Sequence, residues 1–350
     1  MTTIRGVIAD KLKSAFLVLI LAPLPQTVVA QTNAAQPAAA KINTIRLMVS
    51  PSGSGPYNAF STVQTQMDKL SKTLRLSVEE TPGFNFNVKY MATRPDRFKN
   101  TIFGTGSVLN WAARTGQKPF YPKPLKAMED FRTVMVLGLT FNAWVTLDKK
   151  IKTPKDFVGK RVGIGLLTQN EWGMHQRMIL DSWKMTPKLA SLDTLGPGQN
   201  IAALLDGRTD VGTLFGLTSA DGAITVVTGP HRKLEASQRD WQYVNVPAEM
   251  TKSSNIPFRI VEYAPNTLPN QPEKVTMFGD LLLLSVHKSM PNALVKEFVR
   301  VFVENGEKIR KYSGFFRPLT GKTLSYTAKT NPESFHPGAI EAFKELGLLN

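Results

Sequence analysis

The sequence contains no cysteine, which excludes disulfide bonds, thiolate metal sites and cysteine nucleophiles. It also has little histidine: its four histidines are far apart along the chain, and none has the spacing of metal ligands. No stretch is long and apolar enough to span a bilayer, since the longest such run, residues 15–24, is about half of the length that a spanning helix needs. With 42% hydrophobic and 20% charged residues, the 350-residue chain is expected to form a packed core, and it is long enough for two domains.

The N-terminus has the features of a secretory signal peptide. Three basic residues precede the apolar run 15–24, and the small residues Val28, Val29 and Ala30 then offer a cleavage point. We therefore expect residues 1–30 to be a signal peptide cleaved near Ala30, residues 31–42 to be a flexible leader, and the mature protein to be periplasmic. A short uncleaved anchor is the alternative.

The formal net charge is +16, and without residues 1–30, which hold three basic residues and one acidic residue, it is +14. A charge of this size can steer an anionic ligand or favour anionic surfaces. The basic residues are scattered without a run of five, so no nucleic-acid partner is expected.

From Ile45 onward the pattern alternates between strand and helix, which predicts an α/β fold with parallel sheets covered by helices. Apolar residues spaced by three and four from Tyr57 to Leu74 predict the first long helix. Residues 131–139 and 143–147 are each apolar enough for a buried strand, and residues 277–286 form one further strand run.

The segment VSPSGSGPYNAF (residues 49–60) joins the first predicted strand to that helix. It lacks the Gly-Lys-Ser/Thr ending of a phosphate loop and the third glycine of a dinucleotide loop. Gly53 and Gly55 nevertheless allow a tight turn close to a ligand, and Ser52 and Ser54 supply hydroxyl groups. The helix that begins near Pro56 offers free N–H groups to an anion, although a turn without a ligand would have the same sequence.

Two further polar turns occur between a predicted strand and a predicted helix. In one, Thr168 and Asn170 are suitable helix N-caps on either side of Gln169, and in the other, residues 104–107 end in Ser107. Three such turns from two parts of the chain suit a ligand held in a cleft between two α/β domains. Trp144 and Trp172 flank the predicted cleft elements and are candidates either for the core or for the wall of a ligand site.

Four segments, in order, resemble solute receptors of the TAXI type, the extracytoplasmic subunits of some TRAP transporters. They are KDFVGKRVGIG, ALLDGRTDVGTLF, EYAPNTLPNQPEKVTMFGDLLLLSV and the C-terminal HPGAIEAFKELGLLN. The resemblance implies a periplasmic-binding-protein type II fold with two α/β domains joined by hinge strands: residues 43–140 and 266–350 in domain 1, and residues 141–265 in domain 2.

The resemblance also implies that the protein captures a small organic anion, a carboxylate or an amino acid, and delivers it to a TRAP-type membrane permease. Transferred by position, the family's ligand contacts fall on the turn within residues 49–60, on the turn at residues 168–170 and on the turn at residues 104–107. With Trp144 added, the candidate ligand-binding residues are Ser52, Gly53, Ser54, Gly55, Tyr57, Ser107, Trp144, Thr168, Gln169 and Asn170. The loops themselves differ from the common family sequences, for example Ser-Gly-Ser-Gly-Pro-Tyr where Gly-Gly-Thr is frequent.

Two other functions fit the same sequence. One is a sensory binding subunit that reports its ligand to a membrane histidine kinase. The other is a secreted enzyme on a binding-protein scaffold, but no nucleophile elbow or metal-binding spacing supports it. We therefore expect no catalytic residues, no metal site and no cofactor.

Overall fold

The computed structural model describes residues 42–349, so the predicted signal peptide and leader lie outside the described residues. Its first part alternates strands and helices, namely β1 (Asn43–Met48), α1 (Gly55–Leu70), β2 (Leu74–Glu79), α2 (Phe84–Met91), β3 (Thr101–Gly106) and α3 (Ser107–Thr115). The long strand β4 (Phe131–Thr146) leads into the second part, which contains β5 (Arg161–Ile164), α4 (His175–Ser182), β6 (Ser191–Thr194), α5 (Pro197–Leu205), β7 (Val211–Thr218), β8 (Thr225–Val227), α6 (Gly229–Ala236), β9 (Gln242–Val244), α7 (Ala248–Ser253) and β10 (Arg259–Tyr263). The chain returns through β11 (Val275–Gly279) and β12 (Leu281–His287) to α8 (Asn292–Glu304), α9 (Gly306–Tyr312), α10 (Gly321–Leu324) and α11 (Pro337–Glu345).

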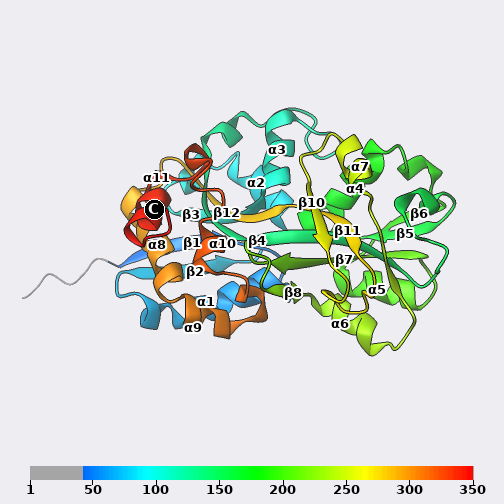
Figure 1. Ribbon diagram of the computed structural model, residues 1–350. Helices are drawn as coiled ribbons and strands as arrows, with labels where there is room; N and C mark the ends of the chain where they lie inside the picture. Colours follow the sequence, from blue (N-terminus) through cyan, green and yellow to red (C-terminus); the bar gives the residue numbers. More distant parts are fainter. Residues whose placement is uncertain (1–41, 350) are drawn as a thin grey trace, which may run out of the picture. The chain divides into compact units, whose positions relative to one another are not determined.

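One sheet runs through the described part of the chain in the order β2-β1-β3-β12-β4-β7-β5-β6. β1 is parallel to β2 and β3, and β5 is parallel to β6 and β7, whereas β12 and β4 run antiparallel to their neighbours. Figure 1 shows α2 and α3 on one side of the β1–β3 strands and α1 on the other, with α4 and α5 on opposite sides of the β5–β7 strands. The expected α/β class is confirmed.

β4 joins the two halves of this sheet. Its first nine residues pair with β12, and residues 139–146 pair with β7. The chain crosses back at Asp280, which lies between β11 and β12. β11 pairs with β10 and the second half of β4, whereas β12 pairs with β3 and the first half of β4. These strands therefore connect the halves in the way that the resemblance implied.

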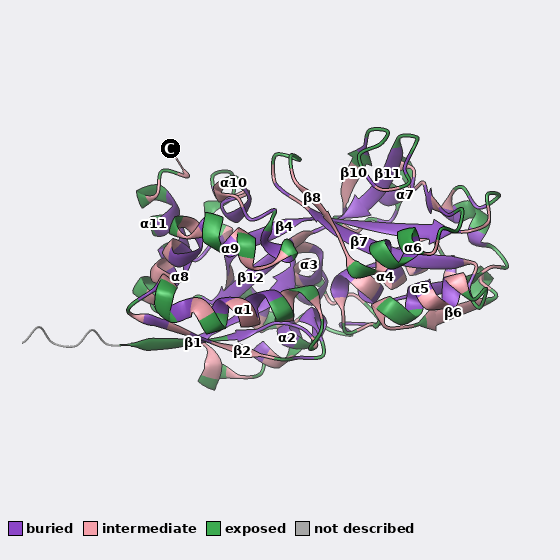
Figure 2. Ribbon diagram, turned by 90° about the horizontal axis from the view of Figure 1, so that it is seen from below, coloured by how far each residue is buried: buried purple, intermediate pink, exposed green. Residues whose placement is uncertain are grey.

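The apolar interior forms three clusters. The largest surrounds β1, β3, β12 and the first half of β4, and the two smaller ones lie on either side of the second half of β4. In Figure 2 the central strands β4, β7 and β12 are buried and the outer faces of the helices are exposed. No helix within residues 42–349 is long and apolar enough to cross a membrane.

Four local predictions were wrong. The two strands predicted at 131–139 and 143–147 are one continuous strand, because Thr140 and Asn142 are buried within the ladder and do not form a turn. The single strand predicted at 277–286 is interrupted at Asp280. Leu74 begins β2 rather than ending the first helix, and no loop separates β3 from α3 at residues 104–107.

Candidate functional site

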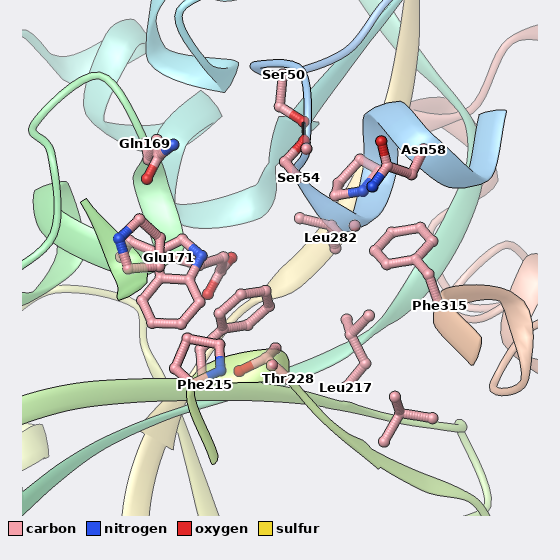
Figure 3. A pocket seen from close by; sticks show the side chains of 18 of the residues that line it. Ser50, Ser54, Asn58, Gln169, Glu171, Phe215, Leu217, Thr228, Leu282 and Phe315 are labelled. Atoms are coloured by element: carbon pink, nitrogen blue, oxygen red, sulfur yellow. Dashed lines mark hydrogen bonds between the residues drawn. The ribbon is translucent and has the colours of Figure 1, made fainter. Parts of the chain in front are cut away.

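A cavity of about 390 Å³ lies between the two halves of the sheet (Figure 3), within the size range of small-ligand sites. Its wall combines short polar side chains with aromatic rings and has two charged residues, Glu171 and Arg232. The residues that line it include Ser50, Gly53, Ser54, Gly55, Pro56, Asn58, Gly83, Phe84, Gln169, Asn170, Glu171, Trp172, Pro197, Phe215, Leu217, Thr228, Gly229, Pro230, Arg232, Leu282 and Phe315.

The first wall is the loop between β1 and α1, residues 49–54, referred to below as the first loop. Gly53 adopts a positive φ of 81°, which turns the chain so that Ser54 can act as the N-cap of α1. The Ser54 hydroxyl accepts a hydrogen bond from the N–H of Tyr57 and lies 2.6 Å from the Ser50 hydroxyl. The start of α1 is therefore fixed with its N-terminus at the cavity.

Two other helix N-termini also reach the cavity, those of α5 at Pro197 and α6 at Thr228. A Gly-Pro dipeptide stands at the start of each of the three helices, with Gly196 as the N-cap of α5, and the sequence contains only these three: Gly55-Pro56, Gly196-Pro197 and Gly229-Pro230. Proline suits the first turn of a helix, where its missing N–H costs nothing and its fixed φ is helical. The repeated dipeptide is the sequence signal by which the α5 and α6 walls could have been found.

The second wall is formed by residues 165–169, the second loop, and by the single π-helical turn Asn170–Met174 that follows it. The loop folds tightly onto this turn: the N–H of Gly165 donates to the carbonyl of Trp172, and a Cβ at Gly173 would lie 2.2 Å from the carbonyl oxygen of Gly165. The predicted capping by Thr168 or Asn170 was wrong. Thr168 is exposed, and Asn170 lies inside the turn with its amide donating to Glu171.

The second loop also contacts the first half of the molecule, at the N-terminus of α2. The backbone N–H of Asn85 donates to the carbonyl of Thr168, and the Asn85 side-chain amide donates to the carbonyl of Leu167. A Cβ at Gly83 would lie 2.4 Å from the same Thr168 oxygen, so only glycine permits this approach. This contact ties the second wall of the cavity to the first half of the molecule.

Behind the cavity wall, Glu171, His175 and Asp280 form a buried cluster. The Nδ1 atom of His175 lies 3.5 Å from the Glu171 carboxylate, and its Nε2 atom lies 3.5 Å from the Asp280 carboxylate. Burial raises the pKa of Asp280 to about 6. Burial alone would lower the pKa of His175, but the Glu171 and Asp280 carboxylates outweigh it and raise that pKa above its usual value.

Aromatic rings make up much of the remaining wall. Trp172 and Phe215 meet edge to face with ring centroids 4.8 Å apart, and Phe315 lies against Gly55. Of the two tryptophans that were candidates for the wall, Trp172 lines the cavity and Trp144 does not. Trp144 is fully buried and packs against Phe157, because β4 directs it into the core of the second half.

Five of the ten predicted ligand-binding residues line this cavity, namely Gly53, Ser54, Gly55, Gln169 and Asn170. The other five, Ser52, Tyr57, Ser107, Trp144 and Thr168, do not. Ser52 points its backbone N–H at Glu80, Tyr57 packs on the core, and the Ser107 hydroxyl donates to Asp280. Other residues line the cavity although the sequence analysis did not predict them. Glu171 and Thr228 are two of these and are labelled in Figure 3.

Several solved structures of binding proteins are similar to this chain. MatC from Rhodopseudomonas palustris, solved with bound malate, shares 11% identity over 88% of this chain and 97% of its own, with a TM-score of 0.47. A TctC solute binding protein from Polaromonas, without ligand, shares 16% identity over 79% of this chain and 86% of its own, with a TM-score of 0.45. The binding protein component of an ABC phosphonate transporter from Pseudomonas aeruginosa shares 10% identity over 79% of each chain, with a TM-score of 0.44.

No curated protein sequence matches the chain. The NMT1-like family matches residues 53–347, which include the end of the first loop, the whole second loop, all three Gly-Pro dipeptides and the buried cluster. The chain therefore belongs to the NMT1-like family.

Proposed function

We propose that the protein is a periplasmic solute-binding receptor that captures a small organic anion in this cavity and delivers it to a TRAP-type membrane permease. The observation that carries the proposal is the meeting of three Gly-Pro helix N-termini at one cavity. The first N–H groups of a helix have no intrahelical acceptor, and the helix dipole makes this end partly positive. Each of the three helices lacks one of these N–H groups at its proline, and the N–H of Tyr57 in α1 is already bonded to Ser54, so the remaining N–H groups and the dipole are what an anion would meet. Three such ends around one cavity favour a negatively charged group of the ligand.

The remaining wall suits the rest of a small organic molecule. Arg232, exposed at the rim in the first turn of α6, adds a positive charge on the same side as two of the helix ends. The rings of Phe84, Trp172, Phe215 and Phe315 offer apolar contact. A wall that combines helix N-termini and short polar groups with rings suits a carboxylate with a short carbon skeleton, and an amino acid falls within this class.

Delivery requires that capture change the shape of the receptor. The strands that cross between the halves, β4 and the β11–β12 junction, are few, so a hinge at them can open the cavity with little repacking. A ligand that contacts the first loop and the second loop together stabilises the closed arrangement. The same closure of the cleft would also suit a sensory subunit. Identification of the membrane partner, a permease or a histidine kinase, distinguishes a transport receptor from a sensory subunit.

The test is a thermal-shift screen of the mature protein against small carboxylates, amino acids and neutral sugars, followed by solution scattering with each compound that binds. We expect at least one acid to raise the unfolding temperature, because a ligand that binds only the folded state adds RT ln(1 + [L]/Kd) to its stability. We also expect that acid to reduce the radius of gyration. Stabilisation by sugars with no effect of any acid would overturn the proposed ligand class, and an unchanged radius at saturation would overturn closure.

A further inference from the structure

The Glu171–His175–Asp280 cluster is not explained by the capture of an anion, because it places two carboxylates next to the cavity. Asn170 and Glu171 line the cavity, whereas His175 and Asp280 lie behind them with no exposed surface. We propose that this cluster is a divalent-cation site, of the kind that takes Zn²⁺ or Mn²⁺, built between α4 and the β11–β12 junction.

The three side chains are brought together by the fold. Glu171 and His175 are four residues apart, on consecutive turns of the π-helical segment and α4, and therefore project on the same side. Asp280 arrives from the crossing strands, and its backbone is fixed by hydrogen bonds to Thr140 in the middle of β4. One possible ligand atom from each residue lies within 4.8 Å of the other two.

Three of the four polar atoms that face one another lack hydrogen-bond partners within the described residues, and the fourth, Oε2 of Glu171, accepts a hydrogen bond from the Asn142 amide. Within residues 42–349, no hydrogen bond reaches either ring nitrogen of His175 or the Oδ2 atom of Asp280, although all three atoms are buried. The His175–carboxylate distances of 3.5 Å exceed an ordinary hydrogen bond. Because the two distances start from different nitrogens of one ring, only one of them can separate two ligands of the same ion. A distance of 3.5 Å is close to the separation of about 3.4 Å between two ligands of a tetrahedral zinc with bonds of about 2.1 Å.

Three of the four carboxylate oxygens of the cluster accept hydrogen bonds from neighbouring groups, as the oxygens of metal ligands usually do. The Oδ1 atom of Asp280 accepts hydrogen bonds from the Ser107 hydroxyl and from the N–H groups of Val108 and Leu281, which leaves Oδ2 free. The Glu171 carboxylate accepts hydrogen bonds from the amides of Asn170 and Asn142. Such supporting bonds orient the ligands of a metal and raise its affinity.

Charge balance favours a cation at the same place. Within the described part of the chain, the ion-pair contacts of Glu171 and Asp280 are with His175 alone. Two buried carboxylates with one imidazole carry excess negative charge, and uncompensated buried charge is costly. A divalent cation would cancel it, and His, Glu and Asp are suitable ligands for Zn²⁺ and Mn²⁺.

The geometry also shows how an ion would bind and enter. The two nitrogens of His175 face different carboxylates, so the ion can be coordinated by only one of them. The carboxylate at the other nitrogen either rotates to coordinate the ion as well or accepts the N–H of the ring and thereby fixes its tautomer. Glu171 lies at the cavity wall, which gives the ion a route from solvent (Figure 3). A Cβ at Gly106 would lie 2.5 Å from the free Oδ2 of Asp280, so glycine at this position keeps the space beside that oxygen.

The experiment uses the mature protein after treatment with a chelator, titrated with Zn²⁺ and with Mn²⁺ by calorimetry and weighed by native mass spectrometry. We expect one ion per chain for at least one of the two metals, with a higher unfolding temperature. Asp280→Asn and His175→Gln should each weaken binding a hundredfold or more, and far-ultraviolet circular dichroism verifies that each variant is folded. The matched control is His287→Gln, since His287 also lies near a carboxylate, that of the partly exposed Asp130, but outside the cluster.

Binding lost in the two cluster variants and retained in His287→Gln supports the site. If the native protein binds neither metal, the proposal fails, and a protonated His175 paired with the two carboxylates explains the cluster instead. Because this outcome rests on the native protein, it holds even if both cluster variants fail to fold. Binding that is undiminished in folded Asp280→Asn and His175→Gln, or lost in His287→Gln, also overturns it.

Discussion

The first and second loops of the cavity have the same sequence pattern, a strand, a polar glycine-containing segment and a helix, but different structures. The first loop turns at Gly53, in open space, and leads into an α-helix capped by Ser54 with its N-terminus toward the cavity. The second loop is compressed between Gly165 and Gly173 and leads into a π-helical turn that buries Asn170 and Glu171. The first loop therefore directs the partly positive N-terminus of a helix at the cavity, whereas the π-helical turn after the second loop presents the negatively charged Glu171.

The physical cause of the difference is what surrounds each glycine. A Cβ at Gly53 would meet no atom within 4 Å, so glycine is needed at this position only because of the positive φ. A Cβ at Gly165 would lie 2.3 Å from the Cβ of Trp172, so this glycine serves close packing of one chain segment on another. Glycine thus permits a left-handed backbone conformation in the first loop and close packing of two chain segments in the second.

The largest effect is expected from Gly173→Ala, which would place a methyl group 2.2 Å from the carbonyl oxygen of Gly165. Since the obstacle is backbone, we expect a loss of about 3 kcal/mol or more in the free energy of unfolding, measured by urea denaturation. The control is Gly198→Ala, at an open position in the first turn of α5, where alanine should be neutral or stabilise by about 0.4–1 kcal/mol. Similar losses in both variants would contradict the close packing of the second loop.

The contact between the second loop and α2 is tested by Gly83→Ala. Gly83 has a φ of 141°, and a Cβ there would lie 2.4 Å from the carbonyl oxygen of Thr168. We expect a loss of stability of about 1–3 kcal/mol from the strained backbone. We also expect weaker ligand binding, because the second loop is displaced from the first half of the molecule. Calorimetry with unchanged affinity would show that this contact plays no part in closure.

The α6 wall adds a pH dependence, because its N-terminus is followed by the fully buried His231. Burial lowers the pKa of this imidazole to about 3, so the folded protein holds it neutral while the unfolded chain protonates near pH 6.5. The unfolded state then binds more protons below pH 6.5, and stability falls by about 1.4 kcal/mol per pH unit as the pH decreases from there toward 3.

The measurement is the difference between the urea-unfolding profiles of the native protein and His231→Gln from pH 7 to pH 5. The native profile should fall more steeply than that of the variant. Parallel profiles would show that His231 is not buried in its neutral form.

The smallest effects distinguish the hydroxyls of the two loops. Ser54→Ala removes the N-cap of α1 and should cost about 1 kcal/mol of stability, as well as affinity for an anion bound at that helix end. Thr168→Ala changes an exposed side chain that caps nothing, so its stability should stay within about 0.5 kcal/mol of the native value. Equal losses in the two variants would remove the distinction between the loops.

The fold could be predicted from the sequence to the extent that local patterns determine it. Alternation of apolar segments and amphipathic helices predicted the α/β class, and the long helix predicted from Tyr57 onward corresponds to α1. The continuity of β4 could not be predicted, because Thr140 and Asn142 appear polar in sequence but are satisfied by distant partners, Asp280 and Glu171.

The candidate site was predicted in part for a related reason. Gly53, Ser54 and Gly55 are positioned by their immediate neighbours, so their place at the cavity follows from local sequence. Trp144 and Ser107 depend on which way a strand or a helix faces in the assembled sheet. The cluster of Glu171, His175 and Asp280 needs a contact across more than a hundred residues, which no spacing rule detects.

The most direct test of the proposed function is a calorimetric comparison between the acid that stabilises the protein best in the screen and its primary amide, which has nearly the same shape without the charge. If helix N-termini bind a carboxylate, the amide should bind at least about tenfold more weakly, a difference of about 1.4 kcal/mol or more. The loss should shrink in Ser54→Ala, because one of the groups that fixes the helix end is gone. Equal affinities of acid and amide for the native protein would contradict recognition of an anion at this cavity.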